Sequence, residues 1–392
     1  MAERVDVAII GGGIMGVSTA YWLSRFDPGL RICVFERDPM HEFSSTALSV
    51  ASIRLQFSNP ANVRVSRFGL EFIREFSALT RSVGGVDLGF RSNGYLFLVG
   101  SEAGAATLAE TIAMQRREGA GTMALTAQDL AQRFAWMNTA GVTLASFGGQ
   151  AEGWFDNMGL LSGLRDLARL QGVRFEHAEV TGLKCKGRAV ETLLLSSGRV
   201  ISVGEVVNAA GPRAANVMAM VGEKFPVEPR KRTVFVVDAP GARHPDAPLL
   251  IDYQGYYARP EGNCWITACV PAQDAAVAPD DFVPSHCDFD EIIWPKLYER
   301  IPGFDRAKVL RHWVGHYAFN TLDQNAILGR HPEWRNLSLI NGFSGHGLQQ
   351  APAMGRGLAE LLVHGGFRSL DLSDFAMERI LEKRPFRELG IV

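Results

Sequence analysis

The sequence has 392 residues, of which 47% are hydrophobic, and a formal net charge of −2 at pH 7. This length exceeds the commonest single-domain size, so we expect two domains around large buried cores. Without a global basic excess, composition argues against a partner that is nucleic acid or an anionic membrane and favours small-molecule chemistry.

The five cysteines of the sequence show neither a CxxC nor a CxxH spacing, so we predict no structural metal site. No apolar run reaches the ~18 residues of a membrane span. The N-terminus lacks the apolar run of a secretory signal, and we expect a reducing, cytoplasmic compartment.

The first segment predicts a βαβ unit. Apolar runs at residues 5–10 and 31–35 have the length and composition of strands, and residues 14–25 have that of a helix. Between the first strand and the helix lies a glycine-rich turn. A strand, a tight turn and a helix in this order are typical of a dinucleotide-binding domain.

The turn carries the GxGxxG spacing at Gly11, Gly13 and Gly16. These glycines permit a tight turn, close approach of the backbone to a pyrophosphate and close packing of the helix. Glu36 ends the second strand 36 − 16 = 20 residues after Gly16, where it can accept hydrogen bonds from ribose hydroxyls. A pyrophosphate would lie at the positive end of the helix that begins near Ile14.

The middle of the chain predicts alternating helices and short strands. Asp156 or Asn157 can cap a helix that stops at Gly172. The other predicted elements are a helix with Phe68, Phe72 and Phe76 on one face, a strand at 95–99, helices at 105–117 and 128–134, a meander at 179–184, 189–195 and 199–203, and a separate strand at 206–210.

The last third is first strand-rich, over residues 226–322, which suits a second sheet. A strand at 337–340, a glycine-rich loop at 341–350 and a helix at 352–363 follow, with Pro352 in the first helical turn.

Glu36 alone does not distinguish FAD from NAD, because both carry the same adenosine ribose. An NAD fold would continue at once with another helix and parallel strand, whereas here the next such strand comes only at residue 206. This long interruption is typical of flavoproteins. We predict a mixed α/β and α+β fold: a discontinuous Rossmann-like FAD-binding domain (1–82, 150–222 and 323–392) and an antiparallel or mixed-sheet substrate domain (83–149 and 223–322).

Four blocks together resemble the amine-oxidising flavoproteins that include D-amino acid oxidase, glycine oxidase and monomeric sarcosine oxidase. They are residues 11–16 with Glu36, 44–54, 206–211 and 342–347. Within that family, residues 45–49 and 316–329 are most similar to the subgroup of the mitochondrial FAD-dependent oxidoreductase-domain factor linked to complex I assembly. The resemblance implies FAD as the cofactor. Because His316 stands where sarcosine oxidase has its flavin-linking cysteine, we expect FAD to be bound without a covalent bond, and a covalent link to the histidine stays an alternative.

The resemblance also implies the residues that bind the cofactor. The helix after the glycine-rich loop would direct its N-terminus at the pyrimidine edge of the flavin, where negative charge develops on reduction. The implied set is Gly11, Gly13, Ile14, Met15, Gly16, Glu36, Arg37, Ser44, Ser45, Thr46, Ser49, Val180, Ala210, Gly211, Gly345, His346, Gly347, Leu348 and Gln349.

For chemistry, the resemblance implies hydride transfer from the carbon beside the substrate nitrogen to flavin N5, with an amino acid or N-methylated amine as substrate. Arg54 matches a carboxylate-binding arginine and could equally be a structural ion pair. The catalytic candidates are Arg54, His316 and His346, and the substrate-binding candidates are Arg54, Tyr253, Tyr257, Arg259, Tyr317 and Gln349.

The sequence departs from the family at several of these positions. His316 takes the place of the cysteine that holds the flavin of sarcosine oxidase, Thr267 that of its oxygen-activating lysine, and Gln349 that of a substrate-contacting lysine. The arginine of glycine oxidase would fall at Ala318. With two lysine charges lost, we favour a dehydrogenase over a fast oxidase.

The electron acceptor is then oxygen, a quinone or an electron-transfer protein. Two alternatives remain open. One is a flavin-containing assembly or scaffold protein with little turnover, and the other is a 2-hydroxy acid dehydrogenase in which His316 or His346 removes the hydroxyl proton.

Overall fold

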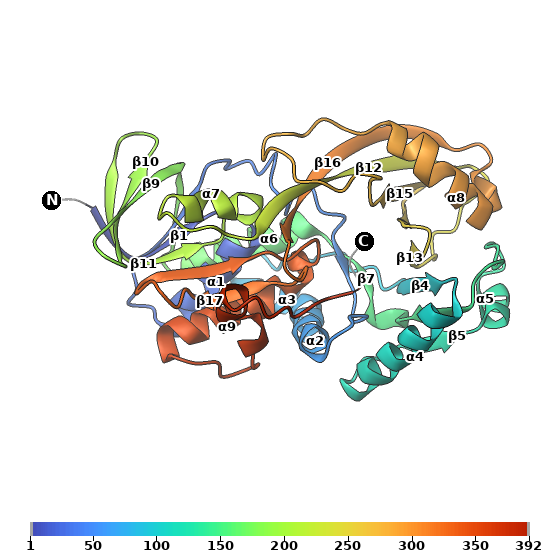
Figure 1. Ribbon diagram of the computed structural model, residues 1–392, viewed down its shortest axis with the longest axis horizontal. Coiled ribbons are helices and arrows are strands. Elements are labelled where there is room, and N and C mark those ends of the chain that lie inside the picture. Colours follow the sequence, from blue (N-terminus) through green and yellow to red (C-terminus); the bar gives the residue numbers. More distant parts are fainter. Residues whose placement is uncertain (1–2, 390–392) are drawn as a thin grey trace.

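The computed structural model describes residues 3–389 and contains two large mixed sheets that lie side by side (Figure 1). The first sheet has the strand order β17-β18-β11-β1-β2-β8, and a β9-β10 hairpin extends from β11. Its strands are β1 (Glu3–Ile10), β2 (Ile32–Glu36), β8 (Arg174–His177), β9 (Val180–Cys185), β10 (Val190–Leu195), β11 (Val200–Asn208), β17 (Ile327–Arg330) and β18 (Leu337–Asn341).

Parallel pairing of β1 with β2 and β11 puts the carboxyl ends of these strands at one edge of the first sheet. Helix α1 (Ile14–Phe26) packs against α6 (Asn157–Leu170) and against α9 (Gly347–His364), which in turn contacts α2 (Pro60–Arg74). A single apolar core joins these helices to one face of the sheet. The short helices are α3 (Phe76–Leu79), α7 (Ala214–Ala219) and α10 (Glu378–Leu381).

The second sheet has the order β16-β12-β15-β14-β13-β4-β6-β5. Its strands are β4 (Tyr95–Val99), β5 (Met123–Leu125), β6 (Leu144–Phe147), β12 (Val227–Asp238), β13 (Leu249–Asp252), β14 (Tyr256–Glu261), β15 (Cys264–Cys269) and β16 (Lys308–Asn320). Helices α4 (Glu102–Arg117), α5 (Ala127–Arg133) and α8 (Trp294–Arg300) lie at its end of the molecule (Figure 1). A two-stranded sheet of β3 (Ser52–Ile53) and β7 (Gly153–Trp154) completes the strands.

The predicted mixed fold with a Rossmann-like sheet is confirmed. The strands of the first sheet come from three separate stretches of the chain and those of the second from the intervening stretches. This membership supports the division into two domains that we propose, and their boundaries stay a prediction.

Two predicted elements differ from the structure. The third meander strand and the following strand form one continuous strand, β11, which pairs antiparallel with β10 at its start and parallel with β1 along its length. Helix α9 begins at Gly347, so Pro352 lies inside it. Pro352 has no N–H to donate to the carbonyl of Leu348, so the helix loses this one hydrogen bond. The loss is small because Pro352 lies just after the first four residues, whose N–H groups have no partner within the helix.

Candidate active site

A cavity of about 550 Å³ lies at the carboxyl edge of β1, β2 and β11 and extends under the second sheet. Open parallel sheets bind their ligands at this edge. The cavity is lined by residues drawn from 10–15, 35–38, 43–54, 178–181, 209–217, 315–318 and 340–349, with Tyr95, Arg232, Val234, Leu249, Ile251, Tyr257 and Phe282 on the side of the second sheet.

The glycine-rich turn has the geometry that its spacing predicts. Gly11 has φ +106°, and a Cβ added there would lie 2.5 Å from the carbonyl oxygen of Ala209. A Cβ on Gly16 would clash with the carbonyl oxygen of Gly11, so Gly16 lets α1 pack against the turn behind the cavity. Two N–H groups fix the Glu36 carboxylate at the mouth of the turn, those of Gly12 and Asp38, each at 2.7 Å.

Thr46, predicted as a cofactor contact, also holds the start of α1. Its Oγ1 accepts a hydrogen bond from the backbone N–H of Ile14 at 3.0 Å. The threonine therefore caps one of the unpaired N–H groups at the start of α1. It ties residues 44–54 to the turn and lines the cavity with its neighbours.

Two observations show that the cavity suits a large polar ligand. Gly211 has φ +54°, and nothing lies within 4 Å of a Cβ added there, so backbone borders open space at the end of β11. Both ring nitrogens of His346 are buried and have no hydrogen-bond partner within residues 3–389. Buried polar atoms are rarely left unsatisfied, so this ring fits a site that contacts a bound group. The FAD molecule would be held here by the turn, Glu36 and the 345–349 segment.

The remaining predicted cofactor residues line the same cavity, although lining alone does not test their role. They are Gly13, Met15, Arg37, Ser44, Ser45, Ser49, Val180, Ala210, Gly345, Gly347 and Leu348.

Arg54 faces the cavity from the segment that follows β3, with its side chain buried. Its Nη1 donates to the carbonyl of Gln56 at 2.6 Å, and its backbone N–H donates to Oε1 of Gln349 at 2.6 Å. The guanidinium carbon lies 4.2 Å from the ring centre of Phe57 and 5.2 Å from that of Phe97. Aromatic faces and fixed backbone contacts hold the cation in one orientation.

The two histidine candidates are both less basic than an exposed histidine. Burial, opposed in part by contacts with Asp281, lowers the pKa of His316, whose Nε2 is 2.7 Å from the carbonyl oxygen of Asp281 and whose ring stacks on Phe282 at 4.3 Å. Burial and the charge of Arg54 lower the pKa of His346 to about 3. His346 is therefore neutral at pH 7, and neither ring brings a second positive charge to the site.

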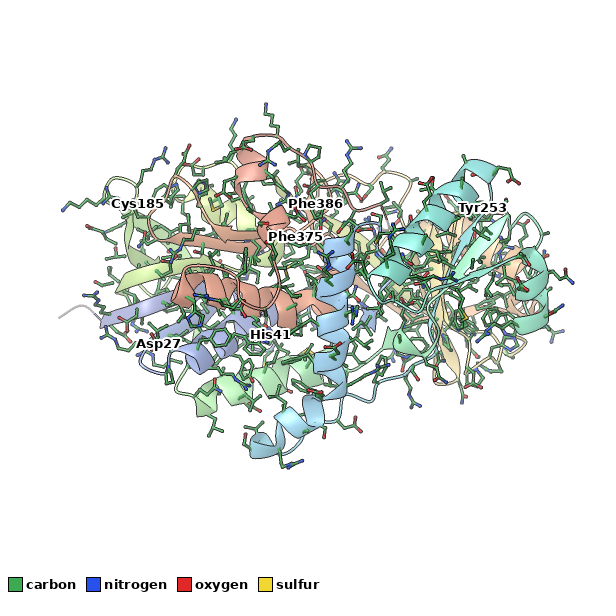
Figure 2. All side chains as sticks on the ribbon, turned by 90° about the horizontal axis from the view of Figure 1, so that it is seen from below. Asp27, His41, Cys185, Tyr253, Phe375 and Phe386 are labelled. Atoms are coloured by element: carbon green, nitrogen blue, oxygen red, sulfur yellow. The ribbon has the colours of Figure 1, made fainter. Side chains whose placement is uncertain are left out.

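The tyrosine and arginine candidates divide between the cavity and its surroundings. Tyr257 and Tyr317 line the cavity. The prediction that Tyr253 walls the pocket was wrong: Tyr253 precedes β14 in a turn, is 44% exposed, and donates its hydroxyl to Gly141 (Figure 2). Arg259 also lies outside the lining, since it pairs with Glu261 and donates to the carbonyl of Val50 at 3.1 Å.

Arg232 is a cavity residue that the sequence analysis missed. It is buried, makes a bidentate pair with Asp274 at 2.7 and 3.0 Å, and lies 4.9 Å from the ring centre of Tyr317. It sits mid-strand in the basic run of β12. Basic residues in such a run usually lie on a face exposed to solvent, so nothing in the sequence distinguished Arg232 from its neighbours.

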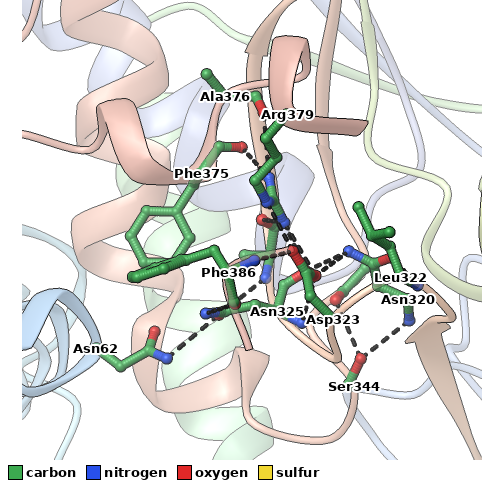
Figure 3. Close-up of polar contacts among 12 residues, drawn as sticks. Asn62, Asn320, Leu322, Asp323, Asn325, Ser344, Phe375, Ala376, Arg379 and Phe386 are labelled. Carbon is green, nitrogen blue, oxygen red and sulfur yellow. Dashed lines mark hydrogen bonds and ion pairs between the residues drawn. The ribbon is translucent and has the colours of Figure 1, made fainter. Parts of the chain in front are cut away.

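A buried cluster of polar side chains, which includes Asn320, Asp323 and Arg379, contacts the loop before α9 at Ser344 (Figure 3). Asp323 pairs with Arg379 at 2.8 Å and accepts from the side chain of Asn320 at 2.8 Å. The backbone N–H of Asn320 in turn donates to Oγ of Ser344 at 3.0 Å, where φ is +48°. The cluster therefore fixes the unusual backbone of the residue that precedes Gly345 and His346.

The comparisons agree with this geometry. Residues 6–361 match the family described as "FAD dependent oxidoreductase" (DAO). The chain is 39% identical over 416 residues to FAD-dependent oxidoreductase domain-containing protein 1 of Bos taurus, covering 96% of this chain and 85% of the relative. It is 26% identical over 399 residues to glycine oxidase of Geobacillus kaustophilus, covering 98% and 99%.

Among solved structures, L-proline dehydrogenase from P. horikoshii superposes with a TM-score of 0.85 at 26% identity, covering 97% of this chain and 99% of that one. Glycine oxidase from Geobacillus kaustophilus has a TM-score of 0.81 at 23% identity over 96% and 99%, which supports the fold. This chain belongs to the DAO family of FAD-dependent oxidoreductases.

Family membership implies FAD as the cofactor. No group of three or more His, Cys, Asp or Glu within residues 3–389 could hold a metal ion. Over the same residues, every helix is too short or too polar to cross a membrane.

Proposed function

We propose that this protein oxidises a C–N bond of a carboxylated amine, either an amino acid or an N-methylated amino acid. The observation that carries the proposal is the buried guanidinium of Arg54, which faces the cavity between the 44–54 and 345–349 segments. A buried cation held by aromatic faces is suited to bind a carboxylate, because its attraction is stronger away from water.

Bound FAD would accept a hydride from the carbon beside the substrate nitrogen. The residues of the chain would hold the substrate for that step. Arg54 would bind the carboxylate, and Tyr257 and Tyr317 would form walls that exclude water and limit its orientations. His346, neutral at pH 7, would accept a hydrogen bond without repelling Arg54.

We infer that a dehydrogenase is favoured over a fast oxidase. Thr267, at one of the two lysine positions of sarcosine oxidase, is buried and donates its hydroxyl to Tyr257 at 2.6 Å. Gln349, at the other, holds the backbone of Arg54. Neither supplies the positive charge that would stabilise a superoxide-like anion. The electron acceptor would then be a quinone or an electron-transfer protein in place of oxygen. We also propose that FAD is held without a covalent bond.

Anaerobic titration with a panel of amino acids and N-methylated amines tests the proposal directly. We expect at least one carboxylated amine to bleach the visible absorbance of the flavin, and reoxidation to be faster with a quinone analogue than with oxygen. No bleaching by any amine, from a protein that dithionite does reduce, would contradict it.

Replacing Arg54 by alanine is expected to weaken the binding of carboxylated substrates by about 30- to 4,000-fold, since loss of one partner of a buried charge pair costs about 2–5 kcal/mol. The measurement is substrate affinity from the extent of flavin bleaching at increasing substrate. Arg54→Lys is the matched variant and should recover part of the affinity. Equal affinity in wild type and Arg54→Ala would show that Arg54 is structural.

A further inference from the structure

The segment that carries Arg54 is fastened by one buried carboxylate, that of Glu152. Oε1 of Glu152 accepts from the backbone N–H of Leu55 at 2.6 Å, and Oε2 accepts from Nε2 of Gln56 at 2.7 Å. The side chain is almost fully buried, with 1% of the residue exposed. Glu152 therefore contacts both residues that follow Arg54 and does not itself line the cavity.

The carboxylate is enclosed by groups that leave it little freedom. Gln56 is held at its other end by Ser146, whose hydroxyl donates to Oε1 of Gln56 at 2.5 Å, and its Nε2 also donates to the carbonyl of Tyr95 at 3.1 Å. On the opposite side the carboxyl lies directly against Gly148, where an added Cβ would clash with it. A shift of Glu152 would displace the backbone beside Arg54.

The charge of Arg54 acts on the Glu152 carboxyl. Burial raises the pKa of Glu152 to about 7, and its hydrogen bonds with Gln56 and Leu55 together with the charge of Arg54 oppose that rise. The other titratable group against it, Tyr95, has a pKa of about 12 because it is buried. Tyr95 is therefore neutral near pH 7, as is His346 beside Arg54.

We propose that Glu152 is a positioning residue for Arg54, and that its ionisation makes carboxylate binding at Arg54 depend on pH. This inference rests on the proposed function only in taking Arg54 as the carboxylate anchor. A bound carboxylate and an ionised Glu152 share the same cation, so each weakens the attraction of the other to Arg54.

The direction of the pH effect follows from this sharing. Below pH 7 Glu152 is mostly protonated and does not compete with a ligand carboxylate for Arg54. Above pH 7 Glu152 ionises and competes for the cation. Carboxylate affinity of the wild type should therefore fall as pH rises from 6 to 8.5, and binding within that range should take up a fraction of a proton, approaching about one.

The test uses the flavin-loaded protein and benzoate, which has no amine to titrate and stays ionised over that range. Binding is followed by the shift of the flavin spectrum, and proton uptake by calorimetry in two buffers of different ionisation enthalpy. Wild-type protein should lose about tenfold in affinity between pH 6 and 8.5. Absence of both the pH dependence and proton uptake in the wild type overturns the proposal without any variant.

In Glu152→Gln the amide cannot ionise, and its NH₂ group faces a donor, either Leu55 or Gln56. A protonated carboxyl presents one donor to the same groups, so at pH 6 we expect benzoate to bind the variant about as tightly as wild type, with an affinity that stays unchanged with pH. At pH 8.5, KM for a carboxylated substrate should be lower in the variant than in wild type, while kcat at saturation changes little.

Glu360→Gln is the matched control, because Glu360, on α9, is equally buried and likewise accepts two hydrogen bonds, here from the backbone N–H groups of Arg368 and Ser369. It should retain the wild-type pH dependence. Benzoate binding that Arg54→Ala leaves unchanged would overturn the anchor and this proposal with it. Benzoate binding that needs Arg54 but has the same pH dependence in Glu152→Gln as in wild type overturns only the role of Glu152.

Discussion

Replacing Gly16 by alanine is expected to yield folded protein that is purified without flavin. The new Cβ would clash with the carbonyl oxygen of Gly11, which is backbone and cannot move away by changing a rotamer. Helix α1 would have to shift from the turn, and with it the N–H groups that would face a bound pyrophosphate. Overpacking of this kind costs about 1–3 kcal/mol, which a two-domain core can absorb, whereas a displaced turn loses its ligand.

The measurement is the ratio of visible to ultraviolet absorbance after desalting, together with the temperature of thermal unfolding with and without added FAD. Gly121→Ala is a suitable control, because Gly121 is exposed and nothing lies within 4 Å of a Cβ built there. Full flavin content in Gly16→Ala would show that the turn tolerates the shift and would contradict this account.

Replacing Arg379 by methionine is expected to lower the free energy of unfolding by about 3–5 kcal/mol. The side chains of Arg379 and Asp323 are 4% and 0% exposed, so the change leaves a carboxylate buried without its main counter-charge. Arg379 also donates to the carbonyls of Phe375 and Ala326, both at 2.7 Å, and these would lose a partner as well. Urea unfolding followed by circular dichroism measures the loss.

Because the same cluster fixes Ser344, the Arg379→Met protein should also bind flavin more weakly, which a flavin-release assay can detect (Figure 3). Arg169→Met serves as the control, since Arg169 forms an exposed pair with Asp166 at 3.6 Å and such pairs contribute little. Equal stability of both variants would contradict a structural role for the cluster.

The glycine-rich end of the cavity could be predicted from the sequence because its signal is local. Gly11, Gly16 and Glu36 lie within one βαβ unit, where spacing alone determines which groups meet. The fold class followed from the same unit and from the long interruption after it. Resemblance added the residues near 45 and 345, which the structure brings to one cavity.

The substrate end was less predictable because its contacts are formed between distant segments. Glu152 and Leu55 are separated by nearly a hundred residues, and they hydrogen-bond next to the point where β3 pairs with β7. Tyr253 and Tyr257 looked alike in sequence, yet a turn exposes the first and a strand buries the second. The start of α9 was predicted five residues too late, at Pro352, because proline is favoured at the first helical position. In the structure the helix begins at Gly347 and tolerates the proline within it.

The segments that line the cavity are spread widely along the chain and include both Gly11 and Gln349. A nascent chain that ends before Gly345 has the pyrophosphate turn but lacks the loop and helix start that close the site. Capture of FAD at this cavity would therefore follow synthesis of residues 345–349, after strands β1 and β2 have already begun to fold. A bound cofactor would tie β1 to α9, and its concentration in the cell would set part of the stability of the protein.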